Sequence, residues 1–289
     1  MRVQMADGWL QIGAAVVLSA LVGLMSPMTI VARPGAQEVN ARQKAYDELL
    51  DLNVRDGLVY YRALKGQRAR LDAYISGLAS ATIDSAPREE QIAFWLNAYN
   101  ALVLQTVIDH YPITQRTREY PARSVRQVPG AFDRSTHRVA GRTLTLDQIE
   151  QTILPGFQDP RVYLALGRGA VGSGRLRSEA YTGANLERQL TEIANECVNR
   201  AQCAEVDRTA NAVKLNAVFS WREKEFVAAY DGKSAPIFAT RSPIERAMLA
   251  FIDGRLLTTE REFLEKNEFK VEFIPFDWTL NDLTGRTGR

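Results

Sequence analysis

One apolar stretch, residues 89–111, constrains the fold more than any other part of the sequence. Its apolar side chains are spread around all sides of a helix, so no clean polar face remains. A helix of this kind is buried on most sides. The run is too short to cross a bilayer and is interrupted by Asn97, Asn100 and Gln105, and Pro112 ends it. We therefore predict a central core helix.

Two amides on this helix need partners. Asn97 and Asn100 are three residues apart and share one face of a helix that otherwise buries apolar surface. A buried amide without a hydrogen bond costs about 1–3 kcal/mol. Either these side chains hold the backbone of a crossing loop, or they line a polar pocket that binds a ligand.

Composition narrows the classes of function. The chain has 289 residues, 46% of them hydrophobic and 24% charged, which is enough material for a sizeable core. A net charge of +2 gives no argument for a nucleic-acid partner. Two histidines and two cysteines are too few for most metal sites. We expect no metal, no cofactor and no nucleic acid.

The first 36 residues read as a targeting segment. An uncharged, mostly apolar run covers residues 9–32, after a single arginine at Arg2. This pattern is typical of a signal peptide or an uncleaved signal anchor. Residues 37–289 would then form one globular domain outside the cytoplasm, periplasmic or secreted, or held at the membrane only through the N-terminal segment.

In such a compartment the two cysteines are candidates for a disulfide. Cys197 and Cys203 lie six residues apart at the end of a helical segment. In an oxidising environment, cysteines this close across a turn are expected to form a disulfide. The alternative is a pair of buried free thiols.

The rest of the chain alternates helical and strand patterns. Apolar stripes predict helices over residues 184–198 and 242–253, the latter with Ser242 and Glu245 as a capping box. A second capping box, Thr145 with Gln148, begins a helix within residues 143–154. The run at 162–166 predicts a buried strand, residues 213–230 a strand followed by a helix, and residues 269–282 a final strand. Neither repeats nor an interdomain linker interrupt the pattern. The fold class is therefore α+β, a single helix-rich domain around the buried central helix with a small sheet.

A glycine-rich loop follows the predicted strand at 162–166. Gly167, Gly169 and Gly172 spell the G-x-G-x-x-G pattern of dinucleotide-binding folds. That motif requires a helix to begin at the last glycines, so that its N-terminus can bind the pyrophosphate. Here the next helical pattern begins near Ala184, so the pattern does not predict nucleotide binding.

Residues 113–142 form an irregular, basic segment. It contains arginines at seven positions and only two acidic residues, Glu119 and Asp133. We expect a solvated loop with a short hairpin. The alternative is a patch that contacts an anionic partner.

Several blocks in this order resemble the domain of unknown function 547 family. They are AFWLNAYNALVLQTVIDHYP, TLTLDQIEQTIL, DPRVYLAL with LRSEAY, LNAVFSWREKEF and PFDWTLND. The resemblance spans roughly residues 44–282, and its most distinctive feature is Trp95, Asn97, Tyr99 and Asn100 on one helix. The family has no settled biochemical role, so the resemblance implies a fold more than an activity.

The resemblance implies that this chain differs from many relatives at the positions where they carry reactive side chains. Many relatives have histidines where this chain has Gln151 and Tyr163, and cysteines where it has Arg168 and Ser173. A cysteine–histidine pair is typical of thiol hydrolases and transferases. This chain lacks those thiols and histidines, although Glu150 remains. We expect Gln151 and Tyr163 to line a ligand site.

Our leading hypothesis is an exported envelope protein that binds a small or anionic ligand without catalysis. The site would lie between Asn97, Asn100, Glu150 and the loop 167–174, with Arg168 supplying a positive charge.

Two alternatives remain. The first is a cell-envelope hydrolase that uses Ser173 with His137 and Glu150, or Glu150 alone to activate water. The second is a scaffold that contacts partners through the basic segment 113–142.

Overall fold

The structure is a computed structural model that describes residues 34–284. The leader predicted over residues 1–36 lies outside the described residues, apart from its last three, which begin α1 (Pro34–Asn53). Among the helices of the described range, none combines the length and apolar character needed to cross a membrane.

The remaining elements are helices, short strands and turns of 3-10 helix. The further α-helices are α2 (Tyr61–Gly66), α3 (Arg68–Leu78), α4 (Arg88–His110), α5 (Leu146–Gln148), α6 (Leu186–Val198), α7 (Ala217–Trp221), α8 (Glu223–Tyr230), α9 (Pro243–Asp253) and α10 (Thr258–Glu265). The strands are β1 (Val54–Arg55), β2 (Leu58–Val59), β3 (Thr136–Val139), β4 (Arg142–Thr145), β5 (Ala204–Asp207), β6 (Ala212–Asn216) and β7 (Lys270–Ile274).

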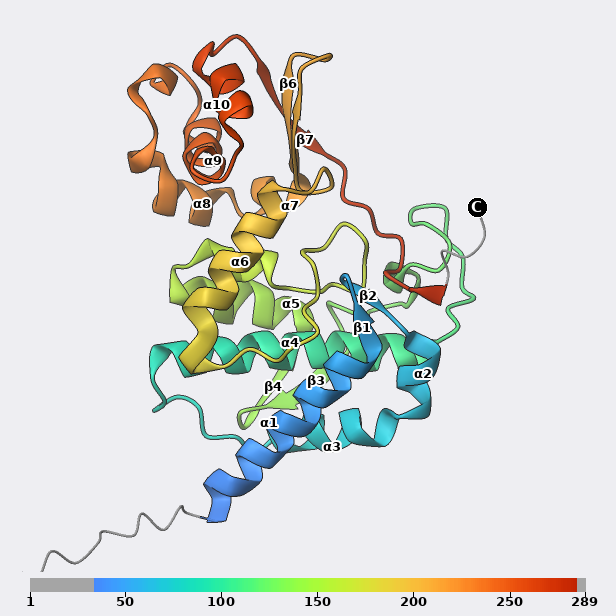
Figure 1. Ribbon diagram of the computed structural model, residues 1–289. Coiled ribbons are helices and arrows are strands. Elements are labelled where there is room, and N and C mark those ends of the chain that lie inside the picture. Colours follow the sequence, from blue (N-terminus) through green and yellow to red (C-terminus); the bar gives the residue numbers. More distant parts are fainter. Residues whose placement is uncertain (1–33, 285–289) are drawn as a thin grey trace, which may run out of the picture.

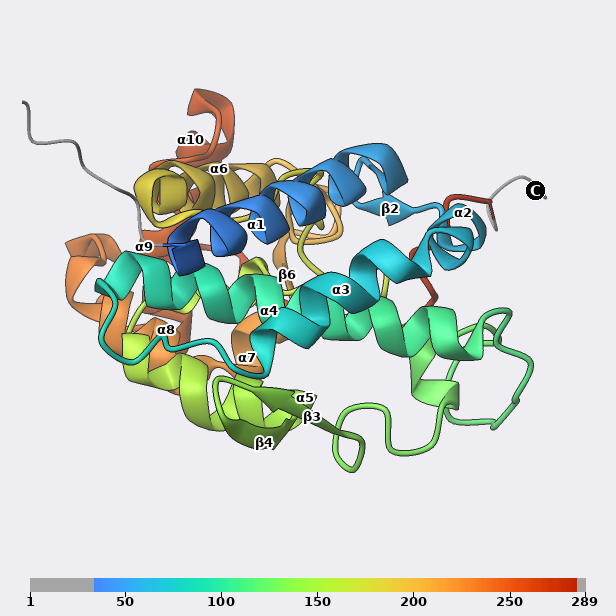
Figure 2. The ribbon, with the colours of Figure 1, turned by 90° about the horizontal axis from the view of Figure 1, so that it is seen from below.

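Helix α4 is the centre of the fold, as the sequence predicted. It crosses the lower half of the molecule, and seen from below it lies between α1 and α6 on one side and α5 with the β3–β4 hairpin on the other (Figures 1 and 2). Its side chains from Leu96 to Leu104 are all buried. A helix covered on this many sides has no amphipathic stripe, which explains its uniform hydropathy.

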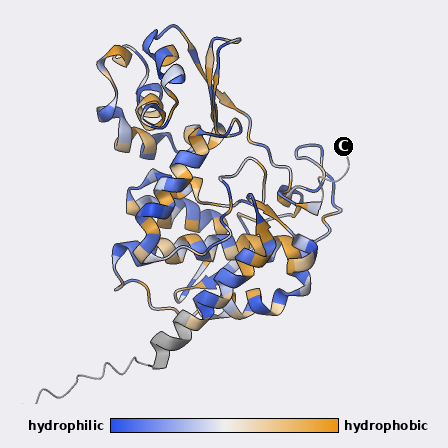
Figure 3. Cartoon of the chain, viewed as in Figure 1, coloured by the Kyte–Doolittle hydropathy of each residue, from blue (hydrophilic) through white to orange (hydrophobic). Residues whose placement is uncertain are grey.

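The core continues from α4 into α1, α3 and the β1–β2 hairpin. Hydrophobic residues concentrate where these elements meet (Figure 3). Tyr46 of α1 and Tyr74 of α3 stack with ring centroids 4.1 Å apart, and Leu49 and Leu71 are buried beside them. Aromatic pairs of this kind add about 0.5–1.5 kcal/mol beyond their buried area.

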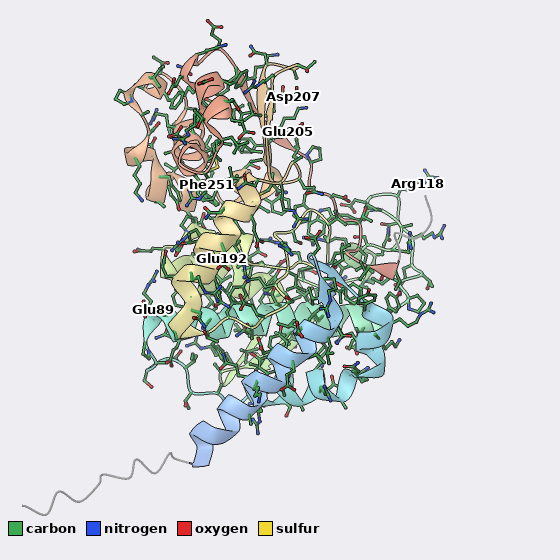
Figure 4. The ribbon with its side chains drawn as sticks, viewed as in Figure 1. Glu89, Arg118, Glu192, Glu205, Asp207 and Phe251 are labelled. Carbon is green, nitrogen blue, oxygen red and sulfur yellow. A yellow bond between two sulfur atoms is a disulfide. The ribbon has the colours of Figure 1, made fainter. Side chains whose placement is uncertain are left out.

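The upper lobe in Figure 1 carries the small sheet that was expected. Its strand order is β5-β6-β7, with β5 antiparallel and β7 parallel to β6. Helices α7 to α9 pack their aromatic rings together: Phe219 and Phe226 have centroids 5.0 Å apart, and Phe251 contacts both. Figure 4 shows Phe251 inside this lobe, whereas Glu205 and Asp207 lie on β5.

The predicted strand at residues 162–166 was wrong. Residues Pro160–Leu164 form a 3-10 helix, in which the Asp159 side chain accepts a hydrogen bond from the backbone N–H of Arg161 and Pro160 occupies the first turn. A short apolar run cannot distinguish a buried strand from a buried helical turn by periodicity. The Asp-Pro pair before it was the overlooked helix-start signal.

Residues 276–284, the C-terminal segment, return from β7 to the N-terminal half. The backbone N–H of Val59 donates to Asn281 at 2.8 Å, and the Tyr61 hydroxyl donates to the Asn281 side chain at 2.6 Å. Asp282 pairs with Val59 as a parallel bridge, and Leu280 pairs with Ala170 as an antiparallel one. The segment therefore joins the β1–β2 hairpin to the glycine-rich loop.

Candidate functional site

A polar cleft lies where the end of α7 meets the α5 region and the C-terminal segment. Its volume is about 320 Å³. Five parts of the chain contribute to it: the basic segment, the α5 region, the glycine-rich loop, the end of α7 and the C-terminal segment. The residues that line it are Tyr120, Arg126, Phe132, Asp147, Glu150, Gln151, Arg168, Trp221, Arg222 and Trp278.

The floor of the cleft is a buried carboxylate with three donors. Arg168 binds Glu150 through two N–H groups, at 3.1 and 2.8 Å. Arg222 donates to the same carboxylate at 2.8 Å, and the Tyr99 hydroxyl donates at 3.0 Å. Glu150 lies in a single turn of π-helix, Ile149–Ile153. Such turns are frequent at functional sites.

The environment of Glu150 keeps it ionised. Burial raises the pKa of the carboxyl, but the charges and hydrogen bonds of Arg168 and Arg222 lower it by more, so the pKa lies at about 2. A general base works best when its pKa lies near the pH at which the enzyme operates. Glu150 is therefore a weak base whose oxygens already accept hydrogen bonds.

Arg222 joins the upper lobe to this carboxylate. It lies between α7 and α8, is 4% exposed, and its guanidinium stacks over the ring of Tyr163 at 4.4 Å. It donates to Glu150 and, at 2.8 Å, to the side-chain oxygen of Gln151. Its Nε is buried without a hydrogen-bond partner. Two guanidinium groups thus share one buried carboxylate.

Arg126 supplies a further positive charge. Its guanidinium lies over the rings of Phe132 and Trp278, 4.6 and 4.3 Å from their centroids. It makes no ion pair with an acidic residue in the described part of the chain, and its Nε is buried without a partner. Aromatic faces attract a cation without neutralising it. Arg126 is therefore held in place with its charge available.

The cleft also has an aromatic wall and one carboxylate without a hydrogen-bond donor in the described range. Trp221 is 45% exposed and stacks against Trp278, with centroids 6.1 Å apart and planes 18° from parallel. Phe276 contacts both rings. Asp147 is half-buried and its carboxylate has no hydrogen-bond partner among residues 34–284. Burial raises its pKa, and Arg126 partly offsets this.

The two amides of α4 hold loops and do not line the cleft. Asn97 exchanges two hydrogen bonds with the backbone of Tyr181, at 2.8 and 2.9 Å. Asn100 donates to the carbonyl of Ala165 at 3.1 Å and accepts from the N–H of Gly167 at 2.8 Å. Of the two roles that the sequence left open, the structure shows the first: Asn100 holds the start of the glycine-rich loop, and Asn97 holds the backbone at Tyr181.

Ser173 faces a different cavity from Glu150. Its hydroxyl accepts a hydrogen bond from the backbone N–H of Arg168 at 2.9 Å, and its side chain lines a small cavity beside the disulfide. His137 lies on β3, where burial lowers the pKa of its imidazole and its Nε2 has no partner. No hydrogen bond among the described residues joins Ser173, His137 and Glu150, so the structure does not bring the proposed triad together.

The other predicted positions are found at or beneath the cleft. Gln151 lines it. Tyr163 lies under Arg222 and donates to Glu225 at 3.2 Å. Arg168 was expected to offer its charge to a ligand, but its side chain is 2% exposed and its charge is opposed by Glu150. The expectation for Arg168 therefore needs correction: it supports the site from beneath.

Seven of the ten residues that line the cleft were missed from the sequence: Tyr120, Arg126, Phe132, Asp147, Trp221, Arg222 and Trp278. Arg126 was seen only as one of seven arginines, and nothing in its neighbours separates it from the others. The Trp-Arg pair at the end of α7 offered one signal, because a large exposed aromatic side chain beside polar residues can mark a binding surface. These residues come from distant parts of the chain, and only the tertiary structure brings them together.

Other features of the sequence have definite outcomes. Cys197 and Cys203 form the predicted disulfide, with Cα atoms 5.1 Å apart. Within residues 34–284, no group of three or more histidine, cysteine, aspartate or glutamate side chains is arranged to hold a metal ion.

Comparison with known proteins gives one match. Residues 83–198, from just before α4 to the end of α6, match the model of a family described as protein of unknown function, DUF547. The match is narrower than the span of residues 44–282 expected from the sequence. No curated protein and no solved structure matches the chain. Glu150, Gln151 and Arg168 lie inside the matched range, whereas Trp221, Arg222 and Trp278 lie outside it.

Proposed function

Because residues 83–198 form a domain of the DUF547 family, whose function is unknown, we propose a role for this chain from its own cleft. The cleft binds a small anionic ligand, and it does so without covalent catalysis. The single observation that carries this proposal is Arg126, a cation fixed by aromatic rings in a cleft and not paired with an acid in the described range.

The charge balance of the cleft supports an anion. Arg126, Arg168 and Arg222 line it together with Asp147 and Glu150. Arg168 pairs with Glu150, and Arg222 pairs with Glu150 and with Glu225 at 3.7 Å, so in the described range only Arg126 of the three lacks an ion pair. Burying like charges together is costly unless a counter-charge is present. An anion that accepts hydrogen bonds from Arg126 would supply that counter-charge, and guanidinium groups bind carboxylates and phosphates through paired hydrogen bonds.

A hydrolase gains no such support. A serine nucleophile needs a base within hydrogen-bond reach, and the only hydrogen bond of the Ser173 side chain in the described range is with a backbone N–H. Glu150 is held at a pKa of about 2 by two arginines, which leaves it a poor acceptor of a proton from water near neutral pH.

Replacing Arg126 by glutamine tests the proposal. The probes are acetate, phosphate, sulfate and glucuronate, titrated into the full chain by calorimetry. We expect at least one of them to bind, and Arg126→Gln to weaken that binding about 10- to 100-fold, because a hydrogen bond to a charged group contributes about 1.5–3 kcal/mol.

Arg134→Gln is the matched control. Arg134 belongs to the same basic segment, is 72% exposed, and has its one ion pair in the described range with Asp133, at 3.9 Å. This variant should bind the probe as the original chain does. Equal affinity in the Arg126→Gln variant, or no binding of any probe, would overturn the proposal.

We also infer that the domain acts outside the cytoplasm. The disulfide between Cys197 and Cys203 supports this, because such bonds persist mainly in oxidising compartments. Alkylation of thiols in intact cells before lysis provides the test. Both cysteines should resist modification until a reductant is added, and two reactive thiols in untreated cells would contradict the inference.

A further inference from the structure

We propose that the anionic ligand is an acidic carbohydrate, a chain of sugar rings that carry carboxylates. This inference rests on the proposed function and names its ligand class. One ring would stack on the aromatic wall while its carboxylate binds Arg126, and the following sugars would extend along the basic segment.

The aromatic wall is suited to a flat ring with an apolar face. Trp221 exposes 45% of its surface beside the cleft although it is among the largest apolar side chains. Its nearly parallel partner Trp278 and the adjoining Phe276 hold it in one orientation. An exposed aromatic patch rimmed by polar residues marks a binding surface. The C–H face of a sugar offers the apolar contact that such a ring accepts.

The cleft contains hydrogen-bond acceptors as well as arginines, and this combination favours a sugar as the ligand. The carboxylate of Asp147 has no donor among the described residues, and Gln151 uses only its oxygen, which accepts from Arg222. Ionised carboxylates accept hydrogen bonds only. Hydroxyl groups of a sugar would supply those donors. A nucleic-acid strand, with one negative charge per nucleotide, would instead place phosphates near Asp147 and Glu150.

The basic segment extends the positive charge away from the cleft. Arg116, Arg118 and Arg123 are exposed on the loop that follows α4, and none makes an ion pair in the described range. Arg118 lies at the outer edge of the molecule (Figure 4). Tyr120, between them in sequence, lines the cleft itself. A ligand longer than one sugar would therefore meet arginine in the cleft and again along this loop.

The test compares matched probes on the full chain. The probes are trisaccharides of galacturonate and of mannuronate, their neutral methyl esters, the single sugars, acetate, and a single-stranded oligonucleotide. We expect one of the trisaccharides to bind at least tenfold more tightly than acetate, and its methyl ester to bind at least tenfold more weakly. The charged trisaccharide should also bind more tightly than the single sugar.

Variants separate the two halves of the inference. Trp221→Ala should weaken binding of the trisaccharide about fivefold or more, consistent with the energy of an aromatic contact. The double variant Arg116→Gln, Arg118→Gln should weaken binding of the trisaccharide more than binding of the single sugar. Arg134→Gln, away from both features, again serves as the control.

The possible failures are distinguishable. If acetate or phosphate binds in an Arg126-dependent way and no acidic trisaccharide binds more tightly, the carbohydrate inference is wrong and anion binding stands. Preference for the oligonucleotide would also reject it in favour of a nucleic acid. If no probe binds, both proposals fall together.

Discussion

Replacing Arg168 by alanine is expected to lower the free energy of unfolding by about 3–5 kcal/mol, the cost typical of removing one partner from a buried ion pair. Arg168 is 2% exposed and makes two hydrogen bonds to Glu150, and its Nη1 also donates to the carbonyl of Tyr163 at 3.3 Å. The variant would leave a buried carboxylate with only Arg222 and Tyr99 as donors.

The dependence on pH distinguishes lost charge from lost packing. The folded-state pKa of Glu150 is about 2, below its ordinary value near 4.5. A lowered pKa contributes stability that is present above the ordinary value and disappears as the pH falls through the folded value. The difference in unfolding free energy between the original chain and Arg168→Ala should therefore shrink between pH 4.5 and pH 2.

Denaturant unfolding measures both effects, with Arg142→Ala as the control. Arg142 pairs with Asp84 at 2.8 Å, but both side chains are largely exposed. Exposed pairs contribute about 0–1 kcal/mol, so this variant should lose little stability. A small loss for Arg168→Ala, or a loss that does not change with pH, would show that the ion pair does not stabilise the site.

Replacing Gly174 by alanine is expected to cost more than about 3 kcal/mol of stability, beyond the usual range for one added methyl group. A methyl group on Gly174 would lie 1.6 Å from the carbonyl oxygen of Leu164, which is backbone and cannot rotate away. Gly172 has a similar constraint from the backbone of Asp277, at 2.6 Å. The loop must therefore shift for either substitution to be accommodated.

Thermal unfolding monitored by circular dichroism provides the measurement. Gly66→Ala is the matched control, because Gly66 ends α2 and has no atom within 4 Å of the added methyl group. Alanine is favoured over glycine in helices by about 1 kcal/mol, so this variant should be at least as stable as the original chain. Similar unfolding temperatures for the two variants would refute the packing argument for the glycine-rich loop.

These contacts also explain the G-x-G-x-x-G pattern. Gly169 has a φ of +66°, a conformation that glycine adopts without strain. Gly167 and Gly172 are crowded by Leu176 and Asp277. The spacing resembles a nucleotide fingerprint, but each glycine is accounted for by local packing or backbone conformation, and α6 begins only at Leu186.

Features that depend on neighbouring residues were predictable from the sequence. Both capping boxes formed as expected, Thr145 with Gln148 and Ser242 with Glu245. The central helix was predicted over residues 89–111 and spans Arg88–His110. Each signal acts within one or two turns of helix, where spacing alone decides which groups meet.

The cleft was less predictable because its residues come from distant parts of the chain. Glu150 and Gln151, which were singled out from the sequence, both line the cleft. Arg126 gains its role only when Trp278, which is 152 residues later, covers its guanidinium. Arg168 is buried and paired with Glu150, which the sequence did not indicate, because no local pattern shows that Arg168 and Arg222 share one carboxylate. Charge in a sequence does not reveal which charges are already paired.

The C-terminal segment has a consequence for the order in which the protein matures. Trp278 completes the cleft, and Asn281 bonds to Tyr61, 220 residues earlier. Contacts this distant in sequence form late, because closing a long loop costs entropy before the contact stabilises it. A chain synthesised from its N-terminus can therefore assemble α1 to α4 early, yet its cleft is complete only after nearly all of its residues have been made.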